Sequence, residues 1–117
     1  MLNNIPVYIK ITRDLERKII NGIIPIRAKL LSVRNLALEY NVNPNTIMKT
    51  LNLLEENGYI RTDSTNGKYV TEDRMFLKNM RDKLLNEEVD KFIDGLKKLG
   101  YGLADALPII ENKIKKD

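Results

Sequence analysis

Apolar residues recur at steps of three and four along the first sixty positions of this 117-residue chain, in three separate runs. The first run covers residues 7–21 and stops before Gly22, a residue type that commonly ends helices. The second covers residues 31–40, with Ser32 in the N-cap position, and the third covers residues 43–58. Such spacing places apolar side chains on one face of a helix. The pattern therefore predicts three amphipathic helices that pack together.

The third run, NPNTIMKTLNLLEENG, carries boundary residues at both ends. Asn43 is a preferred N-cap residue, because its side chain accepts a hydrogen bond from a backbone N–H of the first turn. Pro44 suits the first helical position, since its φ is already helical and it has no N–H to leave unpaired. Gly58 supplies a left-handed residue just past the end. These residues predict one helix between Asn43 and Gly58.

The two faces of this helix differ in chemistry. The core side is apolar and carries Ile47, Leu51 and Leu54. The other side carries amides, a hydroxyl and a cation but no carboxylate, namely Asn45, Thr46, Lys49 and Asn52. Such groups bond base edges and phosphates in a DNA major groove. An ordinary solvated helix face would look the same, so this feature alone leaves both interpretations open.

The preceding run favours the DNA-binding interpretation. Only Asn41 and Val42 separate the helix predicted for residues 31–40 from the cap at Asn43. Two short helices joined by so tight a turn form a helix-turn-helix, in which the second helix reads DNA. We therefore expect residues 43–58 to be the recognition helix.

A β-hairpin is predicted directly after the recognition helix. Residues 59–62 and 68–71 are typical of short strands, and the turn between them is rich in Asp, Ser, Asn and Gly. A hairpin in this place forms a wing, whose tip at Asn66, Gly67 and Lys68 could reach the DNA backbone or minor groove. A purely structural hairpin is about equally consistent with the sequence.

Residues 72–117 predict a helical tail. Residues 72–98 read as one long helix, with a bend or break at Asn86 or Gly95 as an alternative. A second helix is expected at 103–115, where Pro108 should kink it or reset its start. Two helices cannot enclose this many large apolar residues, so the tail either packs back on the winged domain or buries its stripe against a second copy. Since groove-reading modules usually bind as two-fold dimers, we expect the second, a homodimer. The predicted interface residues are Leu84, Val89, Phe92 and Leu96.

Charge and composition narrow the function classes. The net charge is +4, and residues 1–71 carry ten Lys or Arg against six Asp or Glu, whereas residues 72–117 carry ten of each. The excess positive charge thus lies with the helix-turn-helix, which favours a polyanion as partner. The absence of His and Cys removes the usual general base and thiolate metal sites. No nucleophile–base pair, phosphate loop or metal cluster is visible, so we expect no enzyme, no cofactor and no metal.

Many of these residues, in the order in which they occur, make the chain resemble the GntR family of bacterial transcription regulators. The resemblance is strongest to its YtrA subfamily. The matching positions are Pro6-Val7-Tyr8, Gly22, Leu30, Ser32-Val33-Arg34, Leu36-Ala37, Asn43-Pro44-Asn45-Thr46, Lys49, Leu54-Glu55, Gly58 and Gly67. The resemblance covers roughly residues 6–70. It implies that DNA is bound by Arg34, Asn43, Asn45, Thr46, Lys49 and Gly67. Ser32, from the same motif as Arg34, and Lys68, at the wing tip, complete the candidate set.

Together these features predict a mainly α fold with a small β-hairpin, in which residues 1–71 form a winged helix-turn-helix domain and residues 72–117 a helical dimerisation tail. The expected function is sequence-specific transcription regulation, as a repressor, by a homodimer on a two-fold symmetric operator. The alternatives are a winged-helix protein-interaction module and a non-specific architectural DNA binder. A small-molecule effector is a further possible partner, which the sequence does not identify. No membrane span or signal peptide is visible, so we expect a cytoplasmic protein.

Overall fold

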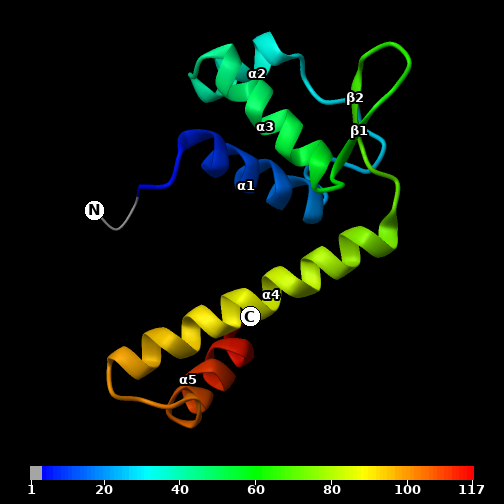
Figure 1. Cartoon of the computed structure of the whole chain (residues 1–117). Coiled ribbons are helices and arrows are strands. Elements are labelled where there is room, and N and C mark those ends of the chain that lie inside the picture. The colour runs from blue at the N-terminus through cyan, green and yellow to red at the C-terminus, as the bar shows by residue number, and fades with distance from the viewer. Residues whose placement is uncertain (1–3) are drawn as a thin grey trace. The chain divides into compact units, whose positions relative to one another are not determined.

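The computed structural model describes residues 4–117 of the chain. This part contains five helices and one two-stranded antiparallel sheet (Figure 1). It divides into two compact units, one that ends at Asn79 and another formed by Met80–Asp117. The predicted fold class, mainly helical with a small β-hairpin, is confirmed.

The first unit begins with three helices, α1 (Val7–Ile20), α2 (Val33–Tyr40) and α3 (Pro44–Glu56). The predicted N-caps are also present, since the side chains of Ser32 and Asn43 accept hydrogen bonds from the first turns of α2 and α3. All three helices contribute buried apolar side chains to one core, namely Ile11, Leu15, Ile19, Leu36, Ala37, Ile47, Leu51 and Leu54.

Two buried threonines, one in α1 and one in α3, bond to the same carbonyl oxygen of α1. The hydroxyl of Thr12 donates to the carbonyl oxygen of Tyr8 at 2.6 Å, and the hydroxyl of Thr50 donates to the same oxygen at 3.1 Å. Both side chains are almost fully buried, so their polar groups need these partners. The start of α1 is thereby fixed against the middle of α3.

The hairpin follows α3 as predicted. Strand β1 (Ile60–Thr62) pairs with β2 (Lys68–Val70) in antiparallel register. Ile60 and Val70 lie opposite each other and are buried, which ties the base of the hairpin to the helical core. We call residues 59–71 the wing.

The connector between α1 and α2 adds a third short segment to this sheet. Lys29 pairs with Tyr69 in an antiparallel bridge, and the N–H of Leu30 donates to the carbonyl oxygen of Lys68 at 2.8 Å. On the other side of this bridge, the N–H of Val70 donates to the carbonyl oxygen of Ala28 at 2.9 Å. The sequence pattern does not predict this pairing, because one bridge residue has no strand-like run around it.

The first turn of α4 (Arg74–Lys98) completes the first unit. The ring of Phe76 meets the ring of Tyr59 edge-on, with centroids 5.2 Å apart. Gly58 has a φ of +91°, and a Cβ there would lie 3.2 Å from the Phe76 ring. The glycine therefore serves both the left-handed helix end and the close approach of this ring.

The second unit contains the rest of α4 and helix α5 (Leu103–Lys116). Helix α4 is continuous, so it does not break at Asn86 or Gly95. Helix α5 begins at Leu103, as predicted, and Pro108 lies inside it, so of the two alternatives the proline does not reset the start. The Asp105 carboxylate accepts from the N–H of Gly102 at 2.8 Å and fixes the helix start there instead.

Candidate nucleic-acid interface

The exposed face of α3 has the composition expected of a recognition surface. The side-chain oxygen of Asn43 accepts from the N–H of Asn45 at 2.8 Å and caps the helix. Asn45, Lys49 and Asn52 are exposed and Thr46 is half-buried, while the opposite side of the helix is buried. The cap thus orients a polar, carboxylate-free face toward solvent.

Lys49 is held by an aromatic ring. Its ammonium lies 5.8 Å from the centroid of the Tyr8 ring. Within residues 4–117, no carboxylate forms an ion pair with it. A cation over an aromatic face keeps its full charge while its side chain is restrained. Lys49 therefore remains available to a phosphate or base.

Helix α2 presents Arg34 close to its N-terminus. The hydroxyl oxygen of Ser32 accepts from the N–H of Asn35 at 3.1 Å, so Ser32 acts in the structure as an N-cap. Arg34 is exposed in the first turn. Free backbone N–H groups and the helix dipole at such a terminus favour an anion, to which an arginine adds charge.

A hydrogen-bonded group fixes α2 against α1. The hydroxyl of Tyr40 donates to Asp14 Oδ2 at 2.6 Å, and Lys18 Nζ lies 3.0 Å from the same oxygen. Burial and the bond to Asp14 raise the pKa of Tyr40 to about 12. The bond from Tyr40 lowers the pKa of Asp14. Asn41 then adopts a left-handed conformation, with a φ of 55°, and makes the tight turn into α3.

The turn of the wing is organised by Asp63. Its Oδ1 atom accepts from the N–H and hydroxyl of Thr65 and from the N–H of Gly67. These bonds, that of the Thr65 hydroxyl foremost, lower the pKa of Asp63. A Cβ at Gly67 would lie 3.0 Å from Cε2 of Tyr69, so a side chain there would require the ring to shift. The close approach of the Tyr69 ring thus explains a glycine at position 67 without any DNA contact. The DNA contact of Gly67 stays a prediction.

Lys68 has an acidic partner within the protein. Its Nζ lies 2.9 Å from Oε1 of Glu55 near the end of α3, and it donates to the hydroxyl of Thr62 at 2.6 Å. The bond from Lys68 is the main cause of the lowered pKa of Glu55. The contact joins the wing to the recognition helix. A DNA contact by Lys68 stays a prediction, and it would compete with this ion pair.

The eight DNA-binding candidates come from three places in the first unit: the start of α2, the start of α3 and the wing. These three places lie along the upper edge of the first unit in Figure 1. Sequence periodicity correctly predicted which face of α3 is exposed. It did not reveal that Tyr8 holds Lys49, although Tyr8 belongs to the motif that opens α1.

The four predicted interface residues lie in α4 and are incompletely covered. Val89 and Phe92 are each 43% exposed, and Leu84 and Leu96 are half-buried. Further large apolar side chains of the second unit are exposed as well, namely Leu85, Leu99, Tyr101, Leu103, Leu107, Ile109 and Ile114. The second unit therefore carries more exposed apolar surface than isolated exposed residues would account for.

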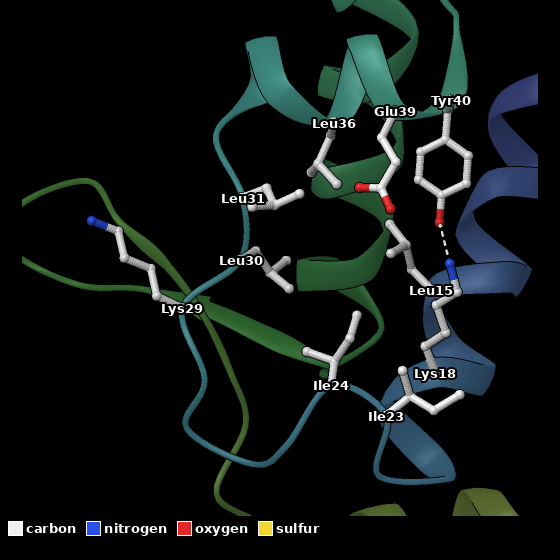
Figure 2. A pocket seen from close by; sticks show the side chains of 10 residues that line it. All are labelled: Leu15, Lys18, Ile23, Ile24, Lys29, Leu30, Leu31, Leu36, Glu39 and Tyr40. Atoms are coloured by element: carbon white, nitrogen blue, oxygen red, sulfur yellow. Dashed lines mark hydrogen bonds between the residues drawn. The ribbon is translucent and has the colours of Figure 1, made fainter.

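A pocket of about 210 Å³ lies between α1, α2 and the connector (Figure 2). Its walls are mostly aliphatic, from residues such as Leu15, Ile24 and Leu36, and Glu39 and Tyr40 also line it. Such a lining suits a small apolar or amphipathic molecule. Within residues 4–117, no group of His, Cys, Asp or Glu is arranged to hold a metal ion. No helix in the described range is long and apolar enough to cross a membrane.

Comparison with known proteins gives consistent matches. Residues 7–70 match the family described as "Bacterial regulatory proteins, gntR family". The protein named "Uncharacterized HTH-type transcriptional regulator YhcF" of Bacillus subtilis is 30% identical over 95 residues, which are 81% of this chain and 78% of that protein. "HTH-type transcriptional repressor YtrA" of the same organism is 37% identical over 68 residues, 58% of this chain and 52% of YtrA.

A solved structure extends the likeness to nearly the whole chain. The "GntR family transcriptional regulator from Listeria monocytogenes" superposes with a TM-score of 0.84 at 31% sequence identity. The match covers 94% of this chain and 96% of that one, so it includes the helical tail as well as the winged unit.

Proposed function

We propose that this chain, which belongs to the gntR family of bacterial regulatory proteins, acts as a repressor that binds a two-fold symmetric operator as a homodimer. Its family membership makes it a DNA-binding transcription regulator and not an enzyme. The observation that carries this proposal is the exposed, carboxylate-free face of α3, on which the Lys49 ammonium lies over the Tyr8 ring. In a helix-turn-helix this face enters the major groove.

The proposed division of labour within the interface follows from residue chemistry. Asn45 and Thr46 open α3, where amide and hydroxyl groups can reach base edges. Arg34 at the start of α2 supplies a phosphate contact that sets the register of the protein on the duplex. Lys49 supplies either a base or a phosphate contact from the middle of the same face.

The homodimer is supported by the second unit. Its apolar side chains stay exposed in a single chain, including Val89 and Phe92 at 43% each. A second copy packed on the same surface would bury them in a two-fold interface. The first unit alone offers few phosphate contacts, so specific binding at physiological salt gains from two linked copies. We accordingly assign DNA binding to residues 1–71 and dimerisation to residues 72–117.

Repression is supported by similarity to YtrA, which is named a transcriptional repressor. The shared region is 37% identical over 68 residues, and it corresponds to about half the length of YtrA. A dimer that occupies an operator at a promoter excludes other proteins from that DNA, which is the simplest mode of repression for a chain with so small a second unit.

Selection of bound sequences from a random duplex pool tests the proposal. We expect an enriched inverted repeat whose half-sites lie about 10 base pairs apart, centre to centre, or a multiple of that spacing. Retention of all sequences with equal affinity would support an architectural DNA binder instead. Failure to bind any duplex would support a protein-interaction module.

A further inference from the structure

Three residues from three different segments share the outer face of the wing. Lys29 pairs with Tyr69 across one bridge, and Arg61 pairs with Tyr69 across the β1–β2 ladder. Directly paired residues of antiparallel strands point to the same face of the sheet. Lys29, Tyr69 and Arg61 therefore form a row across the sheet.

This row lies on the side of the wing that faces away from α3. The neighbouring pair, Thr62 and Lys68, points the other way, because both side chains bond to Glu55 of α3. Since side chains alternate between faces along a strand, Arg61 and Tyr69 must point outward. Arg61 is exposed, in agreement with this geometry.

The tyrosine ring organises the two cations. The guanidinium carbon of Arg61 lies 5.4 Å from the centroid of the Tyr69 ring. The same ring and Cε of Lys29 both border Gly67, since a Cβ there would lie 3.0 Å from Tyr69 Cε2 and 3.4 Å from Lys29 Cε. The Lys29 side chain therefore runs toward the wing tip, and Figure 2 shows it directed away from the other pocket residues.

These two cations differ from others in the first unit. Lys18, Arg27 and Lys68 each form an ion pair with a carboxylate. In residues 4–117, neither Lys29 nor Arg61 has such a partner. Two positive groups beside one ring repel each other, so the row gains stability when an anion joins it.

The carboxylate of Asp63, in the wing turn, is not an ion-pair partner of Lys29 or Arg61. Asp63 Oδ1 already accepts hydrogen bonds from Thr65 and Gly67. Within residues 4–117, no ion pair joins the Asp63 carboxylate to Lys29 or Arg61. The row keeps both positive charges.

We propose that Lys29 and Arg61, set on either side of Tyr69, form the phosphate-binding site through which the wing contacts the DNA backbone. Lys29 lies three residues before Ser32, the N-cap of α2, and its side chain borders Gly67 at the wing tip. Arg61 and Lys29 take the role that the sequence suggested for Lys68, whose ammonium is bound to Glu55. The proposal rests on the DNA-binding function, and it adds two contacts that position the protein without reading sequence.

The test is the salt dependence of duplex binding, measured by fluorescence anisotropy on a sequence obtained from the random pool. Lys29→Gln and Arg61→Gln should each lower the slope of log affinity against log salt by about 0.9, because each variant loses one phosphate contact. The affinity gap to the wild type should therefore widen by about eightfold between 1 M and 0.1 M salt. Arg61→Lys should restore most of the slope.

Two further variants, each of which also removes one positive charge, serve as controls. Lys68→Gln should lower the slope less than Arg61→Gln, since its ammonium already has an internal partner. Lys97→Gln, in the second unit, should leave the slope unchanged. The sequence motif selected from the pool should be the same for all variants, because a phosphate contact reads no base. Thermal unfolding of each variant shows that it is folded before binding is measured.

Three results would overturn the proposal. The first is a wild-type slope in both Lys29→Gln and Arg61→Gln. The second is an equal loss in Lys68→Gln and Arg61→Gln, which would show that the general field of the wing acts and not this row. The third is a wild type that binds no duplex, which would remove the DNA-binding function together with the row, whereas the first two leave that function intact.

Discussion

The lysines of the first unit differ in what holds them, and this difference decides what each can do. Lys68 is bound to Glu55 and serves the packing of the wing on α3. Lys18 is bound to Asp14 and serves the packing of α2 on α1. Lys49 rests on the ring of Tyr8, which restrains it without neutralising it. Helical spacing alone made Lys49 a candidate, but only the fold identifies which lysines already have acidic partners.

Lys49→Ala tests whether the exposed polar face of α3 contacts DNA. We expect a loss of about 1–3 kcal/mol on the selected sequence if Lys49 reaches a base, or a salt slope smaller by about one if it reaches phosphate. Quantitative binding isotherms at several salt concentrations distinguish the two. Lys97→Ala, which removes an equal charge from the second unit, is the matched control. Unchanged affinity and slope in Lys49→Ala would remove this residue from the interface.

Tyr40→Phe tests the group that fixes α2. At neutral pH the variant should be about 1 kcal/mol less stable, because a partly exposed hydrogen bond to a carboxylate is lost. Asp14 has a lowered pKa when folded, so this gap should narrow as the pH falls through that pKa. The pKa of Tyr40 is raised to about 12 in the folded state, so the wild type should lose its advantage as the pH rises from about 10 toward 12.

Denaturant titrations of both proteins across this pH range provide the measurement. A gap between wild type and Tyr40→Phe that stays constant from acid to alkaline pH would show that the bond to Asp14 contributes nothing to stability.

At the scale of elements, the sequence predicted the parts that depend on local pattern. The three helices, their caps at Ser32 and Asn43, and the hairpin all follow from spacing and boundary residues. The bridge between Lys29 and Tyr69 could not be predicted this way, because it joins positions forty residues apart through a single pair. Helix α5 begins at Leu103, as the sequence predicted, and Asp105 fixes this start, so Pro108 does not reset it.

The same limit applied to the candidate site. The polar face of α3 follows from helical period, so its members could be chosen before the fold was known. The bond of Lys68 to Glu55, and the placement of Arg61 beside Tyr69, depend on how the wing packs and twists. No local pattern in the sequence encodes those contacts.

Gly58→Ala tests the junction of α3, the wing and α4. Both Gly58 and Gly22 have positive φ, +91° and +84°, so alanine at either should cost about 1–2 kcal/mol in backbone strain. Only at Gly58 would the new Cβ also meet a ring, that of Phe76 at 3.2 Å. Gly22→Ala has open space and is therefore the matched control.

Thermal or chemical unfolding of the two variants gives the comparison. Gly58→Ala should be the less stable of the pair. Equal losses would mean that the Phe76 ring moves aside at no cost, and that the contact does not hold α4 to the first unit.

At the scale of the whole molecule, the proposal depends on a second copy. The second unit leaves Val89 and Phe92 each 43% exposed in a single chain, and the likeness to the Listeria monocytogenes regulator includes this region. A charge of +4 spread over one small chain gives weak binding at physiological salt. Linked half-sites raise affinity by effective concentration, so oligomeric state and operator affinity should change together.

The double variant Phe92→Ala/Leu96→Ala tests this link. Each truncation should weaken association by about 2–5 kcal/mol if the dimer buries the side chain fully. Sedimentation should then show monomers at micromolar concentration, with reduced operator affinity. Leu38→Ala, which removes a side chain that is 71% exposed in α2, should change neither. A double variant that stays dimeric with full operator affinity would exclude this surface as the interface.

The most direct measurement is the number of chains bound to a duplex that carries the selected inverted repeat, compared with a duplex in which one half is scrambled. We expect two chains to bind the full repeat together, with no complex of one chain, and scrambling of one half to weaken binding at least about a hundredfold. One chain per duplex, bound equally well to the full and the scrambled sequence, would contradict it.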